Sequence, residues 1–355
     1  MDLRDGLAIT AAIQGTRSPR GYRTHDDAIQ PATLAAGAGG MMLVKKLLEA
    51  SARHGRPLLA IAIFGGLLLP PLAHALRRVI LPEVLGLTTL VLLRIDIPAA
   101  FAHLRRPGRL FVIIGFHLLL CPLIAFAVVR GLPIDHGIAA GVVVFATGCG
   151  ALSAPAFARL VGLDPELSLL MTLGTTFLVP LTAPPIVFAL TGIDLAIGPA
   201  SFMLRLALTI GLPLLAALGL RRLIGVARLA EIGAAVDGGV VWLLVLYGFG
   251  VMDGLAARIG ADPLWVVAAA LAAFAADFGL NLVTALAFFP LGRAGAASVG
   301  LVSGNRNMAL YLAVLPAGAD PRLGLFFALC QFPLYLSPFL LRPLYRRLMA
   351  HPASA

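Results

Sequence analysis

The sequence contains few charged residues, only three cysteines and almost no lysine. Charged residues make up 12% of the 355 residues and hydrophobic residues make up 60%, and the mean hydropathy is +0.96. These values exclude an ordinary soluble domain and are typical of multi-spanning membrane proteins. Cys121, Cys149 and Cys330 all lie within apolar segments, without metal-ligand spacing or a pattern of disulfide pairs.

Sequence motifs of several enzymes and pumps are also missing. The sequence has no His-Glu-x-x-His zinc motif, no Gly-x-Ser-x-Gly nucleophile elbow and no nucleotide-binding P-loop. An intramembrane enzyme and an ATP-driven pump are therefore disfavoured, whereas a ligand sensor stays an alternative to a transporter. The net charge of +10 lies mostly in short connections between apolar segments. We expect it to set membrane topology rather than to bind nucleic acid, and we expect no protein partner.

Ten apolar segments can be counted along the chain. If the N-terminus is cytoplasmic, fifteen lysine and arginine residues lie in inner connections and five in outer ones. This asymmetry predicts a multi-pass protein of the inner (cell) membrane with both termini in the cytoplasm. The expected spans cover residues 57–76, 82–99, 110–130, 138–161, 166–190, 199–219, 232–254, 263–289, 294–316 and 322–343.

Both ends of the chain differ from the ten-span domain, 57–343. Residues 1–56 form an extension without the apolar segment of a signal peptide, expected to be disordered at first and amphipathic near its end. Translation starting at Met41 or Met42 is one explanation for its composition. Residues 344–355 are expected to form a cytoplasmic tail.

The fourth and ninth segments are interrupted by polar or small residues. In the ninth, Gly304-Asn305-Arg306-Asn307 separates two apolar runs, each about half the ~20 residues that a span requires. Each broken segment is the fourth of five, in 57–190 and in 199–343. We therefore predict an all-α membrane protein of ten transmembrane helices in two inverted five-helix repeats, with the discontinuous helices crossing at the midplane. The alternative is that glycine and proline merely kink two ordinary helices.

Arg306 is the strongest single signal, because an arginine at this depth must face a cavity or a partner. It could replace the charge of a sodium ion, or bind a substrate carboxylate or sulfonate with Asn305 and Asn307. It could also form a buried ion pair with Asp277. Asp277 in turn could supply negative charge or relay a proton, and Asn281 lies one turn further on the same helix face.

Hydroxyl groups and one histidine complete the candidate residues. Ser168, Thr172 and Thr176 share one helix face and could bind a hard cation, or could bond to their own backbone. His117 lies inside the third predicted span. It could titrate in a proton-coupled mechanism, or be a neutral packed residue.

Several short motifs resemble the bile acid:sodium symporter family over roughly 57–343. Leu167-Ser168 and Thr172 fit its Leu-Ser-x-x-x-Thr pattern, and His117 stands where a sodium-site glutamine is expected. Its ninth-helix pattern, Glu-x-Gly-x-Gln-Asn, reads here from Val302 to Asn307, with Val302 for the acid and Arg306 for the glutamine. In the fourth helix Ser153 follows the break, but the expected asparagine is missing.

This resemblance implies a secondary transporter of a small organic anion, in which helices 3–5 and 8–10 form a core and helices 1, 2, 6 and 7 form a panel. Substrate contacts are expected from Arg306, Asn305, Asn307, Ser153 and Asn281, and ion coupling from Ser168, Thr172, His117 and Asp277. The one candidate cofactor is a sodium ion at Ser153, Ser168 and Thr172. Because the acid and the glutamine are replaced, proton-coupled and uncoupled transport are the alternatives to sodium symport.

Overall fold

The computed structural model describes residues 43–52, 54–97, 100, 107–192, 195–316 and 318–350. Met1–Lys45 and Lys46–Ala355 form two compact units, and the elements below belong to the second. Residues 1–42, on which most of the predicted extension falls, lie outside the described residues. Every regular element named in the described part is helical, as the sequence predicts.

The helices follow the predicted segments closely. In chain order they are α2 (Gly55–Leu68), α3 (Pro70–Arg77), α4 (Ile80–Arg94), α6 (Pro107–Gly115), the π-helix η1 (Phe116–Leu120), α7 (Cys121–Arg130), α8 (His136–Thr147), α9 (Ala154–Val161), α10 (Pro165–Thr191), α11 (Pro199–Ile224), α12 (Val226–Glu231), α13 (Gly233–Val251), α14 (Leu255–Ala261), α15 (Pro263–Ala287), the short η2 (Phe289–Leu291), α16 (Gly292–Gly304), α17 (Met308–Val314), α18 (Pro321–Leu329), α19 (Gln331–Leu340) and α20 (Arg342–Ala350). The predicted tail therefore begins inside α20.

In the described part of the chain, six helical stretches are long and apolar enough to cross a membrane, and a seventh counts if the bent pair α2–α3 is one span. The halves of the interrupted segments and the 15-residue α4 are too short to qualify singly. Leu68, Leu223 and Leu264 leave 79%, 84% and 82% of their surface exposed, which suits a lipid environment. The chain is thus a multi-pass membrane protein.

The first predicted span, 57–76, was expected to be one helix and is instead sharply bent. α2 and α3 meet at an angle of 106° around Leu69. Pro70 and Pro71 follow directly, and the residue before a proline is sterically driven out of the helical conformation. The expectation of a single straight span was wrong because it ignored this pair of prolines.

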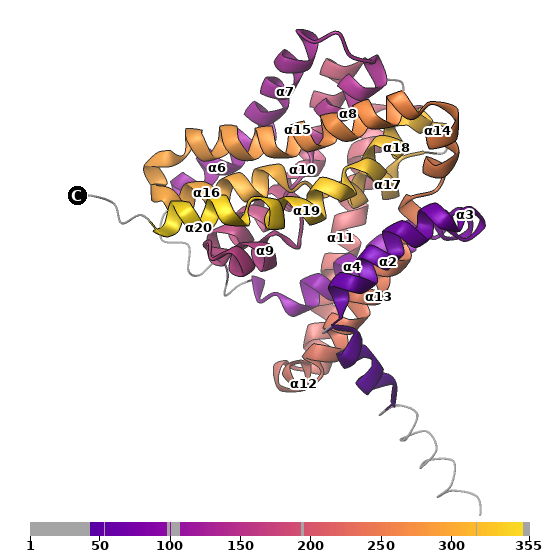
Figure 1. Cartoon of the computed structure of the whole chain (residues 1–355). Helices are drawn as coiled ribbons and strands as arrows, with labels where there is room; N and C mark the ends of the chain where they lie inside the picture. The colour runs from indigo at the N-terminus through magenta and orange to yellow at the C-terminus, as the bar shows by residue number, and fades with distance from the viewer. Residues whose placement is uncertain are drawn as a thin grey trace, which may run out of the picture. The chain divides into compact units, whose positions relative to one another are not determined.

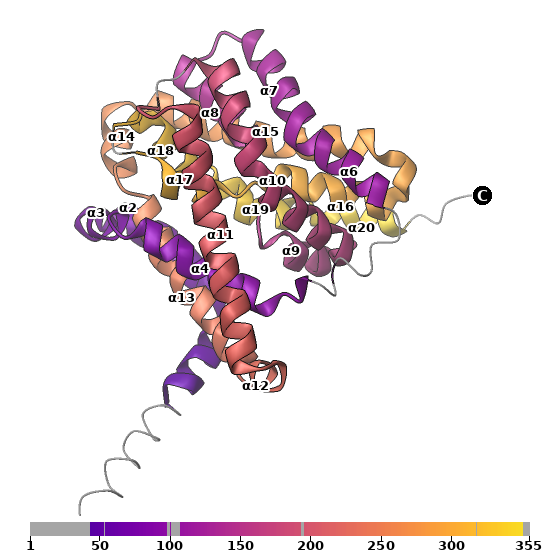
Figure 2. The same cartoon turned by 180° about the vertical axis from the view of Figure 1, so that it is seen from behind.

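The helices of the Lys46–Ala355 unit pack in two groups. In the first, here called the panel, α13 packs against α2, α3 and α4, and α4 packs against α11. In the second, here called the core bundle, α15 packs against α16 and α8, while α10 packs against α8, α9 and α16. α2, α4 and α13 lie side by side in Figures 1 and 2. α10 of the core bundle packs against α11 and so joins the two groups, and α17 contacts both α4 and α11.

Aspartate side chains cap several helices of the core bundle. Asp135 accepts hydrogen bonds from Ile138 N at the start of α8 and from the Trp265 indole of α15, and pairs with Arg322 of α18 at 3.3 Å. Partial burial raises the pKa of Asp135, but the hydrogen bonds from Trp265 and Ile138 and the Arg322 charge outweigh it, so the net pKa lies below its usual value. One carboxylate therefore holds three helix starts together.

Candidate functional site at the crossing of two broken helices

Both interrupted segments break where the sequence predicts, and the two breaks lie against each other. The first break separates α8 from α9, and the second separates α16 from α17. Ala151 N donates to Asn305 O and Asn307 N donates to Cys149 O, each at 2.8 Å, forming an isolated antiparallel bridge. Each break thus satisfies backbone groups of the other, which non-helical backbone in a membrane requires.

Glycines make this close approach sterically feasible. A Cβ added at Gly150 would lie 2.5 Å from Val302 Cγ1, and one at Gly304 would lie 2.6 Å from the carbonyl oxygen of Asp277. A Cβ at Gly300, one turn earlier on α16, would lie 2.6 Å from the carbonyl oxygen of Asn281. The Gly300-x-x-x-Gly304 face of α16 therefore packs directly on the backbone of α15, as small residues allow in membrane helices.

Arg306 lies at the centre of the crossing and is 1% exposed. Its Nη1 donates to Gly148 O at 2.6 Å and to His117 O at 3.3 Å, and its Nε donates to Ser303 O at 2.7 Å. Among the described residues no carboxylate lies within ion-pair distance of it, so the Asp277–Arg306 pair considered from the sequence does not form. Three backbone carbonyl oxygens accept from Nε and Nη1 instead, and Nη2 is buried without a hydrogen-bond partner.

His117 is fully buried beside this guanidinium. Its Nε2 lies 3.1 Å from Gly148 O, which can only accept, so Nε2 carries a hydrogen, and Nδ1 lies 3.1 Å from the Ser303 hydroxyl oxygen. The ring therefore links the first break to α16.

Asp277 and Asn281 face the crossing from α15. Both carboxylate oxygens of Asp277 are buried without a hydrogen-bond partner, beside Gly304. Asn281 Nδ2 donates to the hydroxyl of Tyr345 in α20 at 2.7 Å. Asn281 is thus engaged between helices, whereas Asp277 is an unpartnered buried acid.

The hydroxyl groups of α10 differ in their positions. The Ser168 hydroxyl donates to Asp164 O of its own helix, and Thr176 donates to Thr172 O. The Thr172 hydroxyl oxygen is buried without a partner, next to Gly150. Thr175, which the sequence did not single out, accepts from Gly150 N at 3.1 Å. Thr172 and Thr175 therefore reach the first break, and Ser168 does not contact it.

A cavity of about 270 Å³ lies between the panel and the crossing. Val84 of α4 and Leu244 of α13 line one side, and Ser153, Asn307 and Met308 line the other. Of the predicted substrate residues, Ser153 and Asn307 line this cavity, while Arg306, Asn305 and Asn281 do not. Its wall is apolar with a few polar groups from the two breaks, as in small-molecule sites.

Part of the chain matches a known protein family. Residues 84–228, from the panel helix α4 through the first break to α12, match the Sodium Bile acid symporter family. The match supports membership in that family. No curated protein matches the chain. The family consists of transporters, and the resemblance stated from the sequence is confirmed for the matched segment.

Other polar residues at or next to this cavity were not expected from the sequence. Gln331 of α19 donates to the Tyr247 hydroxyl of α13 at 3.3 Å, and both line the cavity. Glu83, just before Val84 on α4, is buried and both its carboxylate oxygens lack a partner. A glutamine and a glutamate within apolar segments are the sequence signal that could have identified them.

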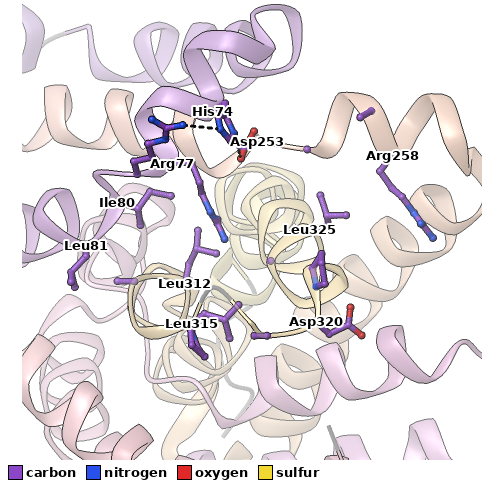
Figure 3. A pocket seen from close by; sticks show the side chains of 18 of the residues that line it. His74, Arg77, Ile80, Leu81, Asp253, Arg258, Leu312, Leu315, Asp320 and Leu325 are labelled. Atoms are coloured by element: carbon purple, nitrogen blue, oxygen red, sulfur yellow. Dashed lines mark hydrogen bonds and ion pairs between the residues drawn. The ribbon is translucent and has the colours of Figure 1, made fainter. Parts of the chain in front are cut away.

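A larger cavity of about 840 Å³ lies between α3, α17 and α18 (Figure 3). His74 bonds to Asp253 at 3.3 Å and accepts from Arg78 at 3.4 Å. Arg77 reaches toward α18, where a Cβ at Gly324 would lie 3.3 Å from its Nη2 (Figure 3). Three arginines and two aspartates, Asp253 and Asp320, therefore line the wall where the panel meets α17 and α18.

The family name implies a sodium ion, for which oxygen atoms at the crossing are the candidate ligands. The carbonyl oxygens of Gly148, His117 and Ser303 are of the kind that binds hard cations. They already accept hydrogen bonds from Arg306. These three carbonyl oxygens therefore do not fit a sodium ion in addition to the Arg306 guanidinium.

Proposed function

We propose that the protein is a secondary transporter that carries a small organic anion across the membrane by alternating access. The observation that carries this proposal is the cavity of about 270 Å³ between the panel and the two crossing breaks. A site between two separately packed helix groups can open to either side when one group moves against the other. Family membership of the matched segment supports the same function.

An anionic substrate is supported by the groups that the breaks present. Ser153 is the N-cap of α9, and its hydroxyl does not cap the helix. Ser153 and Asn307 are half-buried on the cavity wall. Helix N-termini carry partial positive charge and bind carboxylates readily. Leu244 and Met308 supply apolar surface for the rest of a small organic acid.

The proposed architecture has ten spans in two inverted five-helix repeats, with the crossing near the membrane midplane. The described helices provide ten segments for it when each broken pair, the bent pair and α4 are counted as spans. The proposal has both termini in the cytoplasm, which the distribution of lysine and arginine supports. In that orientation the cavity of Figure 3, lined by three arginines and two aspartates, faces outward.

Thermal stabilisation of the purified protein tests the substrate class. We expect one or more small carboxylates to raise the Tm in a saturable manner, whereas the corresponding neutral amides do not. Asn307→Ala should weaken the affinity for that carboxylate about tenfold, because a cavity hydrogen bond to a charged group contributes about 1.5–3 kcal/mol. Leu271→Ala on the exposed face of α15 is the control. Equal stabilisation by acids and amides would contradict an anion site.

Proton coupling is the second candidate for how transport is driven. It is favoured by Asp277, a buried carboxylate without a hydrogen-bond partner beside the second break. A proton could neutralise such a group during the cycle. Uptake driven by a pH gradient would distinguish this mechanism from uncoupled exchange.

A further inference from the structure

The buried Arg306 guanidinium has hydrogen bonds to backbone carbonyl oxygens in place of an ion pair. A buried arginine normally pairs with a carboxylate, whereas here the guanidinium donates to the carbonyl oxygens of Gly148, His117 and Ser303. These oxygens come from three separate helical segments, α8, η1 and α16. Because all three carbonyl oxygens point to the same guanidinium, the crossing is a binding site for one positive charge.

Each of these carbonyl oxygens lacks an N–H donor from its own helix, and the local backbone explains why. Gly148 is the C-cap of α8, and Ser303 lies in the last turn of α16, where carbonyl groups lack intrahelical donors. In the π-helix η1, Cys121 N donates to Phe116 O, one residue before His117. The next amide that could serve His117 O belongs to Pro122, which has no N–H. All three carbonyl groups are thus left free by the local sequence.

The same surroundings hold further oxygen atoms without partners. The Thr172 hydroxyl oxygen, Asn305 Oδ1 and both oxygens of Asp277 are buried and accept no hydrogen bond in the described part of the chain. Thr172 lies beside Gly150 of the first break, and Asp277 lies beside Gly304 before the second. Oxygen atoms at helix C-terminal ends, hydroxyl groups and carboxylates are the ligands that hard cations prefer.

We propose that Arg306 is a covalently attached cation that occupies a monovalent-cation site formed by the two crossing breaks. The protein therefore requires no sodium ion at this position, and removal of the guanidinium turns the crossing into a site for Na⁺ or for free guanidinium ion. This inference concerns the cation alone and does not depend on which anion is transported.

The test compares purified wild-type protein with Arg306→Ala and Arg306→Gln in sodium, potassium and choline chloride at equal ionic strength, and with guanidinium added at non-denaturing concentration. The wild-type Tm should be the same in the three salts. The Tm of both variants should fall and then rise saturably, by about 3–5 °C at tenfold excess over Kd, with Na⁺ or guanidinium but not with choline.

Arg221→Ala is the matched control. The Arg221 guanidinium also donates to helix carbonyl oxygens, those of Leu93 and Ile95, but it pairs with Asp96 at a more exposed position. Its loss should produce no stabilisation that depends on the identity of the cation. An equal response of Arg221→Ala and Arg306→Ala would overturn the proposal, as would Arg306 variants that respond to none of the cations.

Two further measurements test the proposal if Arg306→Ala and Arg306→Gln do not fold. Arg306→Lys retains a cation and should fold and stay insensitive to sodium. A wild-type Tm that rises saturably with sodium and not with potassium overturns the proposal without any variant. Because the readout is cation binding, its failure is distinguishable from failure to bind a carboxylate.

Discussion

Replacing Ala309 with tryptophan is expected to abolish transport while leaving the protein folded. Ala309 lies in the first turn of α17, the second half of the broken ninth segment, and lines the cavity of about 270 Å³. An indole at this position would occupy the space that the proposed substrate needs. The half-buried alanine borders the cavity, so the larger side chain has room to enter it.

Uptake of the stabilising carboxylate into proteoliposomes measures this effect, and we expect a decrease of about a hundredfold, equivalent to about 2.7 kcal/mol of lost binding. Ala268→Trp, an exposed alanine on α15, is the matched control and should transport normally. A folded Ala309→Trp protein with wild-type uptake would show that the substrate passes elsewhere.

Gly304→Ala is expected to cause the largest loss of stability among the conservative substitutions considered. The added Cβ would lie 2.6 Å from the carbonyl oxygen of Asp277, a backbone atom that cannot rotate away. α16 would have to move from α15, and the bridge that joins Asn305 and Asn307 to the first break would be strained. Overpacking of this kind costs about 1–3 kcal/mol.

Thermal unfolding in detergent should show a Tm about 5–10 °C below that of the wild type. Gly279→Ala provides the comparison, because nothing lies within 4 Å of the Cβ that it adds on α15. Alanine also favours a helix more than glycine does, so the Tm of this variant should be unchanged or slightly higher. Equal losses from the two substitutions would mean that close packing at Gly304 is unimportant.

The positions of the helices and of both breaks could be predicted because they follow from local properties. Long apolar runs define most helices, and Arg306 with two asparagines marks the second break. The bend at Leu69 could also have been found from Pro70 and Pro71. Each of these features depends on neighbouring residues in the sequence, so it can be predicted without knowledge of tertiary contacts.

The partners of the site residues could not be predicted in the same way. The sequence offered Asp277 as the natural partner of Arg306, since a carboxylate is the usual neutralising group. The observed partners are carbonyl oxygens, whose availability depends on where helices end and on the π-helix before Pro122. Carbonyl groups occur at every residue, so composition and spacing do not reveal which ones converge.

The central claim is that the cavity at the two breaks can be reached from either side of the membrane. A cysteine at Ser153 tests this most directly, because the three native cysteines are buried and should react slowly. We expect a membrane-impermeant thiol reagent to modify Ser153→Cys from both sides, and the stabilising carboxylate to slow that reaction. Modification from one side only, or a rate no higher than that of the wild type, would contradict alternating access at this site.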